Sequence, residues 1–213
     1  MIISLCGFMG CGKSSVGRRL SALLSCSYAD LDAIIEKAAG RTIPEIFTSE
    51  GEAAFRAMEL TELERVVTSE AHQAGQRKQS LPSQAMGPSL CGPRGSTAFA
   101  TQPDGPLVLS LGGGTVMTPE CAKLVHEHTV CIYLRTSLDV LVERLKSESD
   151  GRPMLSNAGA VGSPIDALRA RIAALMAQRS STYENTAHYT VDTDGKSLDG
   201  IAEEILQLIR YNN

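Results

Sequence analysis

The chain has 213 residues, of which 43% are apolar, 21% charged and only 4% aromatic. A chain of this length buries a sizeable core, so its folding requires no disulfide framework and no structural metal. Its net charge of −4 argues against a non-specific nucleic-acid binder, which normally carries a basic surface.

The amino-terminal sequence and the cysteines are typical of a cytoplasmic protein. The first residues, MIISLCGFMGCGKSS, have no basic region before the apolar stretch, so we expect no signal peptide. No apolar run approaches the roughly 20 residues of a membrane helix. The cysteines are far apart and form no CxxC pair, as expected for small apolar residues in a reducing compartment. They are Cys6, Cys11, Cys26, Cys91, Cys121 and Cys131.

Short apolar runs alternate with amphipathic segments along most of the chain. The predicted strands are residues 2–6, 27–29, 107–111, 130–134 and 187–191. The predicted helices are residues 13–24, 164–179 and 198–208. This alternation predicts an α/β fold with a mostly parallel central sheet flanked by helices. We expect residues 1–213 to form a single domain.

Three segments interrupt the alternation. Residues 33–72 show helical periodicity with no strand between, which predicts a helical excursion from the sheet. Residues 75–105 are rich in Gly, Pro, Ser and Gln and lack periodicity, which favours a flexible insertion. A regulatory or docking loop is the alternative for this insertion. Residues 147–163, with Gly and Pro around Arg152, are a further predicted loop.

The motif GFMGCGKS at residues 7–14 fits GxxxxGK[ST] and stands between a predicted strand and a predicted helix. Its glycines let backbone N–H groups surround a phosphate at the start of a helix. In such a loop Lys13 reaches the β- and γ-phosphates and Ser14 binds Mg²⁺. A chance match in a glycine-rich turn is the alternative, which the strand–helix context disfavours. The residues expected to bind the nucleotide here are Gly10, Cys11, Gly12, Lys13, Ser14 and Ser15.

Other polar residues and glycines are candidates whose local patterns are ambiguous. Asp30 and Asp32 follow a predicted strand and can divide between Mg²⁺ and a substrate hydroxyl, or belong to a loop with a helix cap. Arg56 and Arg179 lie on predicted helices, where arginine usually faces solvent. Residues 112–114 are consecutive glycines at a strand end, which indicates either a close backbone approach to a ligand or a plain tight turn.

Taken in order, these motifs resemble the shikimate kinase family, small P-loop kinases of the nucleoside-monophosphate-kinase type. The matching segments are GFMGCGKS, DLD, GRTIPEIF with GEAAFR, SLGGGT, RPML, and MAQR with the tyrosine that follows. They cover nearly the whole chain except residues 75–105. The resemblance implies transfer of the ATP γ-phosphoryl group to the 3-hydroxyl of shikimate, with Mg²⁺, in chorismate and aromatic amino-acid biosynthesis.

The resemblance also implies roles for the acceptor side of the site. Arg56 and Arg179 would bind the shikimate carboxylate, for which a guanidinium fork is well suited. Asp32 would bond the substrate hydroxyls and accept the proton of the attacking one. Gly113 and Gly114 would supply a backbone cradle for the substrate. Residues 33–62 would be the substrate-binding helical region.

On the nucleotide side, Asp30 would act near Mg²⁺ through water, beside Ser14. Arg152 matches the lid arginine that closes over the phosphates, so it would bind ATP and, with Lys13 and Asp32, serve catalysis. The lid itself would be residues 147–163. Arg144 is the nearest match to the adenine-contacting arginine of the family.

Two other functions are consistent with parts of the pattern. Another small P-loop kinase, for sugar acids or nucleoside monophosphates, would share DLD, FR, GGGT and QR only by coincidence. A catalytically silent nucleotide-binding module would be free to lose residues such as Lys13 and Asp32, which are intact. We therefore expect a monomeric shikimate kinase that uses ATP, with no nucleic-acid or membrane partner.

Overall fold

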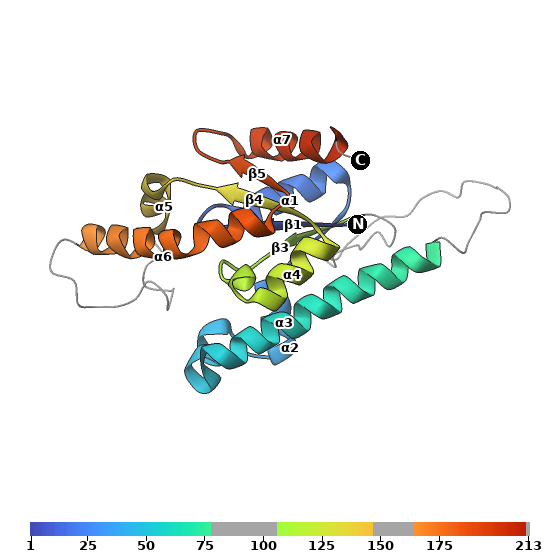
Figure 1. The fold of residues 1–213 in the computed structure, drawn as a ribbon, viewed down its shortest axis with the longest axis horizontal. Helices are drawn as coiled ribbons and strands as arrows, with labels where there is room; N and C mark the ends of the chain where they lie inside the picture. The colour runs from blue at the N-terminus through green and yellow to red at the C-terminus, as the bar shows by residue number, and fades with distance from the viewer. Residues whose placement is uncertain (78–105, 147–163, 212–213) are drawn as a thin grey trace, which may run out of the picture.

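Five parallel strands form one central sheet, in the order β2-β3-β1-β4-β5, in the computed structural model (Figure 1). The structure describes residues 1–77, 106–146 and 164–211. The strands are β1 (Ile2–Cys6), β2 (Ser27–Asp30), β3 (Leu107–Ser110), β4 (Val130–Arg135) and β5 (Tyr189–Asp192). The predicted α/β fold with a mostly parallel sheet is confirmed.

Helices cover both faces of the sheet. They are α1 (Lys13–Leu24), α4 (Pro119–His128), α5 (Leu138–Leu145), α6 (Pro164–Thr186) and α7 (Leu198–Tyr211), with a short 3₁₀ turn η1 (Thr115–Met117). The helices α1 and α7 pack together on one face, and α4 and α6 lie on the other (Figure 1). Coverage on both sides explains why Ile3, Val108 and Ile132 of the inner strands are each 0% exposed.

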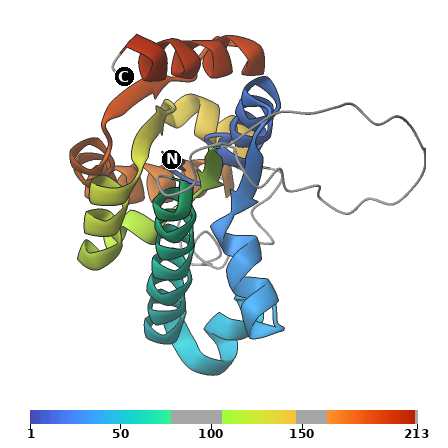
Figure 2. The ribbon, with the colours of Figure 1, turned by 90° about the vertical axis from the view of Figure 1, so that its right-hand side faces the viewer.

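The remaining helices, α2 (Leu31–Ala39) and α3 (Ile43–Arg77), leave the sheet together as a packed pair (Figure 2). They form the helical excursion predicted at residues 33–72, and Gly51 interrupts α3 with φ 82° and ψ 177°. The flexible insertion was predicted to begin at residue 75, whereas α3 continues through residue 77. Gln76 and Arg77 are good helix formers, which allows α3 to continue past Gly75. Residues 78–105 of the predicted insertion lie outside the described residues.

The end of α6 also differs from the prediction. This helix continues to Thr186 rather than ending at Arg179. The sequence of the last two turns, SSTYENT, has a low intrinsic helix propensity. Tyr183 in these turns is only 1% exposed and packs in the core, so tertiary contacts outweigh the local preference.

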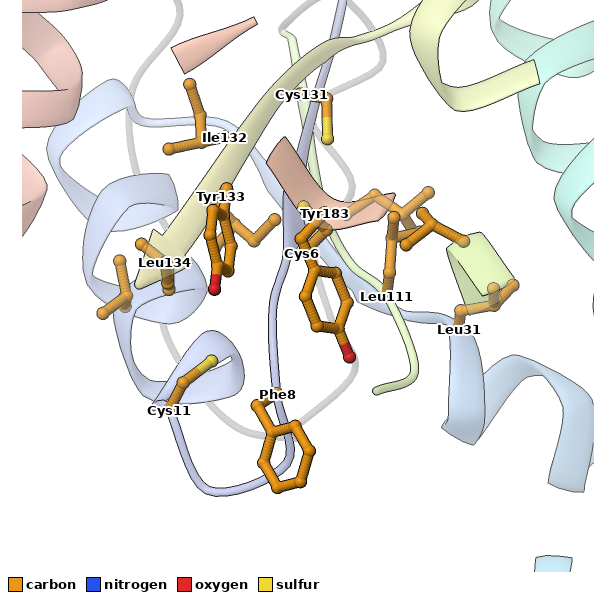
Figure 3. Close-up of a cluster of buried hydrophobic side chains, with 14 of the residues drawn as sticks. Cys6, Phe8, Cys11, Leu31, Leu111, Cys131, Ile132, Tyr133, Leu134 and Tyr183 are labelled. Carbon is orange, nitrogen blue, oxygen red and sulfur yellow. The ribbon is translucent and has the colours of Figure 1, made fainter. Parts of the chain in front are cut away.

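Part of the core lies directly beneath the loop that follows β1. Phe8 and Cys11 of this loop are buried near Tyr133, Leu134 and Tyr183 (Figure 3). In the described part of the chain the cysteines are free thiols, and all but Cys26 are buried: Cys6, Cys11, Cys26, Cys121 and Cys131. Cys91 lies outside the described residues. No helix in the described part of the chain is both long and apolar enough to cross a membrane.

Two histidines link α4 to the segment before β5. His126 and His188 stack with their ring centroids 4.6 Å apart. Nδ1 of His188 accepts a hydrogen bond of 3.1 Å from the backbone N–H of Cys131, so this nitrogen carries no proton in the folded chain. Burial lowers the pKa of His188, and the neighbouring His126 lowers it further.

We expect this pair to make the thermal midpoint fall in mild acid. The unfolded chain protonates His188 below about pH 6.5, before the folded chain does, so the free energy of unfolding decreases from that pH downward. In His188→Asn, which keeps an acceptor but does not titrate, the drop in Tm between pH 7.5 and 5.5 should be smaller by on the order of 1–2 °C, since solvent screens this exposed site. The exposed control His128→Asn should behave like the wild type in differential scanning calorimetry. An unchanged pH dependence in His188→Asn would contradict the prediction.

Candidate active site

A cavity of about 910 Å³ opens where β1, β2 and β3 end. Parallel strands place their carboxyl ends at one edge, so the loops that follow them meet there. In the sheet, β1 lies between β3 and β4. The chain after β1 continues as α1 on one face of the sheet, and the chain after β3 continues to α4 on the other face, so the two connections separate at this edge (Figure 1). The predicted site residues that line the cavity are Gly10, Cys11, Gly12, Lys13, Ser14, Ser15, Asp30, Asp32, Arg56, Gly113, Gly114 and Arg179. Arg152 and the predicted lid at residues 147–163 lie outside the described residues.

The loop after β1 forms a compact cradle at the start of α1. Gly12 precedes the helix with φ 100°, a left-handed conformation that favours glycine. Lys13 is 9% exposed, and its Nζ donates to the carbonyl oxygens of Gly7 at 2.9 Å and Phe8 at 3.0 Å. The ammonium group is therefore held inside the loop, beside the positive end of the α1 dipole, in an arrangement suited to an anion.

Asp30 caps a helix, which is one of the alternatives that its sequence context left open, and it also contacts Ser14. Its Oδ1 accepts from the backbone N–H of Asp32 at 3.2 Å, which caps the start of α2. Its Oδ2 accepts from the hydroxyl of Ser14 at 2.9 Å and from that of Tyr28 at 3.1 Å. One carboxylate therefore both starts a helix and places an oxygen beside the nucleotide loop.

Asp32 is half-buried on the first turn of α2 and faces the cavity. Burial raises the pKa of its carboxyl to about 6, and the nearby carboxylates of Asp30 and Glu59 add to this effect, while Lys13 opposes it. The two aspartates of the DLD motif thus have different surroundings. Asp32 is the one whose pKa lies near the pH at which a general base works best.

Glu59, a buried carboxylate that orients Arg56, was not among the residues predicted from the sequence. Glu59 is 0% exposed, accepts from Thr115 Oγ1 at 2.7 Å and is paired with Nη1 of Arg56. Nη2 of Arg56 donates to Glu52 at 3.0 Å. A signal was present, because Glu59 stands four residues after Phe55 and four before Leu63, within the apolar stripe of α3. A carboxylate in that stripe is rarely buried unless it has partners.

Residues 112–114 bring the backbone close to these side chains. A Cβ at Gly112 would lie 2.7 Å from Asp32 Oδ1, and one at Gly114 would lie 2.6 Å from Arg56 Nη2, so any larger residue would displace both groups. The segment also forms a turn, with a hydrogen bond of 3.3 Å from Thr115 N to Gly112 O. The predicted tight turn is therefore present, and the glycines also let the backbone approach two side chains of the site, while a close approach to a ligand stays a prediction.

Two further arginines reach the cavity from helices later in the chain. Arg179 on α6 is 8% exposed, and its Nη1 donates to the carbonyl oxygen of Gly113 at 3.5 Å. Arg144 on α5 donates to the carbonyl oxygen of Gly10 at 3.2 Å. Arg144, Lys196 and Leu198 line the end of the cavity nearest α7.

A family model described as shikimate kinase matches residues 9–73 and 97–210. A shikimate kinase from Geobacter metallireducens is 35% identical over 203 residues, which are 95% of this chain and 88% of that protein. One from Pelotomaculum thermopropionicum is 32% identical over 211 residues, 99% of this chain and 96% of that protein. The structure of shikimate kinase from Acinetobacter baumannii in complex with shikimate has a TM-score of 0.72 and 29% identity, and covers 100% of this chain and 94% of that one. This chain belongs to the shikimate kinase family and is an ATP-dependent phosphotransferase.

Proposed function

We propose that the cavity binds ATP on the side of α1 and shikimate on the side of α3 and α6, and that it transfers the γ-phosphoryl group to the 3-hydroxyl of shikimate. The observation that carries this proposal is the position of Arg56 and Arg179. They come from helices far apart in the chain, yet both flank the glycines at 112–114 and line the same cavity as Lys13. A half-buried guanidinium group and a buried one, in the same cavity as a phosphate loop, suit an acceptor with a carboxylate.

In the proposed reaction, the 3-hydroxyl oxygen forms a bond to the γ-phosphorus while the bond from that phosphorus to the β–γ bridging oxygen breaks. The proton of the hydroxyl passes to the carboxylate of Asp32. The ammonium group of Lys13 contacts the phosphates and stabilises the negative charge that is spread over several oxygens in the transition state. The N–H groups of residues 113 and 114 and the two arginines hold the acceptor in line.

The residues beside the phosphate loop fit Mg²⁺. The hydroxyl of Ser14 and the carboxylate of Asp30 are hard oxygen donors in mutual contact at the cavity. Within the described residues, no group of three or more His, Cys, Asp or Glu side chains could hold a metal by itself. This suits Mg²⁺ in kinases, which is bound by few protein ligands, water and substrate phosphates. When bound, Mg²⁺ would neutralise phosphate charge, with Ser14 as a ligand and Asp30 acting through water.

The proposal assigns a role to each segment of the chain. Residues 1–213 act as one domain, with the segment 33–62 as the substrate-binding helical region. Residues 147–163 would be the lid that carries Arg152, and residues 78–105 would be the insertion. Arg144 and Leu198 would contact adenine, because they line the cavity beyond the phosphate loop.

A coupled assay that follows ADP release tests the function. We expect turnover with ATP and shikimate, and none above background with gluconate or nucleoside monophosphates. Turnover with one of those controls and not with shikimate would assign the chain to another acceptor. ATP binding without turnover on any acceptor would indicate a silent nucleotide-binding module.

We expect Arg56→Lys and Arg179→Lys each to raise KM for shikimate by about tenfold or more. Lysine keeps the positive charge but loses the planar fork that binds a carboxylate with two hydrogen bonds. KM for ATP should change less than twofold. Arg65→Lys, an exposed arginine on α3, is the matched control and should leave both constants unchanged. A rise in KM for ATP instead would place the two arginines on the nucleotide side.

A further inference from the structure

Tyr183 lies behind the glycines of the site and does not line the cavity. It is on α6, one turn after Arg179, and is 1% exposed. Its phenol O–H donates to the carbonyl oxygen of Gly113, and burial raises the pKa of this phenol while the nearby guanidinium of Arg179 opposes the rise. Arg179 reaches the same carbonyl at 3.5 Å. The phenol group and a substrate-side arginine therefore meet at the same glycine carbonyl.

The ring of Tyr183 is itself fixed by packing. It stacks on Tyr133 of β4 with centroids 5.2 Å apart and an interplanar angle of 21° (Figure 3). The two phenol groups have different surroundings: burial raises the pKa of both, and this rise is opposed by Ser180 at Tyr133 and by Arg179 at Tyr183. A buried side chain locked by a neighbouring strand holds its polar end in one place, as a precise site requires.

The Gly113 carbonyl matters because it determines the direction of the next N–H group. In a trans peptide the C=O and the following N–H point to opposite sides. Holding the carbonyl of Gly113 toward α6 turns the N–H of Gly114 away from α6. Within the described residues, no backbone or side-chain acceptor pairs with that N–H, and Gly114 lines the cavity. Consecutive glycines would otherwise leave this peptide free to rotate.

We propose that Tyr183 is a positioning residue for the phosphoryl acceptor: its hydroxyl orients both the peptide between Gly113 and Gly114 and the guanidinium of Arg179. Tyr183 itself touches no substrate. This inference rests on the proposed function, since it assigns the glycine backbone and Arg179 to the acceptor carboxylate and hydroxyls. It predicts that the hydroxyl, rather than the ring, determines the affinity for shikimate.

The test is Tyr183→Phe, which keeps the ring stack and removes the hydroxyl that donates to Gly113. We expect KM for shikimate to rise about tenfold, while kcat and KM for ATP stay within about twofold. The matched control is Tyr133→Phe, which removes the other hydroxyl of the same ring pair and should leave all three constants at wild-type values. A purely structural role would lower Tm without separating KM for shikimate from KM for ATP.

A second variant keeps the inference testable if the phenylalanine variant folds poorly. Incorporation of 4-aminophenylalanine at position 183 restores a hydrogen-bond donor and should return KM for shikimate to within about twofold of wild type. Wild-type KM in Tyr183→Phe, an equal rise in Tyr133→Phe, or a parallel rise in KM for ATP would each overturn the inference. Failure of the proposed function is a separate result, because the wild-type chain would then not phosphorylate shikimate at all.

Discussion

The substitution Lys13→Met should lower kcat by a factor of about 10² to 10³, equivalent to about 3–4 kcal/mol of transition-state stabilisation. The ammonium group of Lys13 is already fixed inside the phosphate loop by the carbonyls of Gly7 and Phe8. It therefore needs little reorganisation when charge develops on the transferred group. Methionine keeps an unbranched, flexible side chain of similar length, so the packing of the loop is largely retained.

Steady-state kinetics and calorimetry together separate this role from a structural one. The thermal midpoint without ligand should fall by only about 2–4 °C, as for a loss of about 1 kcal/mol in a chain of this size, because the two freed carbonyls adjoin an open cavity and can bond water. Lys123→Met, an exposed lysine on α4, is the control and should retain wild-type kcat. Turnover close to wild type in Lys13→Met would remove Lys13 from the catalytic machinery.

The substitution Asp32→Asn should lower kcat by a factor of about 10² or more, the usual loss when a general base is removed. In the wild type, kcat/KM for shikimate should fall about tenfold per pH unit below about pH 6. The reason is that burial raises the pKa of Asp32 to about 6, and its protonated form cannot accept the hydroxyl proton. The residual activity of Asp32→Asn should lack this acid limb.

The same carboxyl gives a stability readout of opposite sign. The pKa of Asp32 is higher in the folded chain than in the unfolded chain, so ionisation costs stability as the pH rises from about 4 to 6. At pH 7.5, Asp32→Asn should therefore have a Tm equal to or above that of the wild type, although its activity is lost. Asp139→Asn, an exposed carboxylate on α5, is the control for both measurements. A strongly destabilised Asp32→Asn would mean that the lost activity reflects misfolding instead of a missing base.

Local patterns in the sequence were sufficient for the class of fold and for the family. The motif at residues 7–14, flanked by a strand and a helix, is a contiguous unit, so its spacing alone specifies a phosphate loop. The parallel sheet followed from apolar runs that alternate with helical periodicity, and both the fold and the shikimate kinase family are confirmed. Periodicity is less informative at element ends, where α3 continues to residue 77 and α6 to Thr186.

Only the tertiary structure decided how distant residues share one site. An arginine on a helix is usually solvated, and apart from the family resemblance nothing within a few residues of Arg56 or Arg179 indicates that both lie beside the glycines at 112–114. Glu59 pairs with Arg56 on the same helix, but its partner Thr115 is 56 residues away in the chain. Tyr183 reaches Gly113 across 70 positions of the chain in the same way. Burial and hydrogen-bond geometry arise when helices pack on the sheet, and these long-range contacts determine which polar residues become a site.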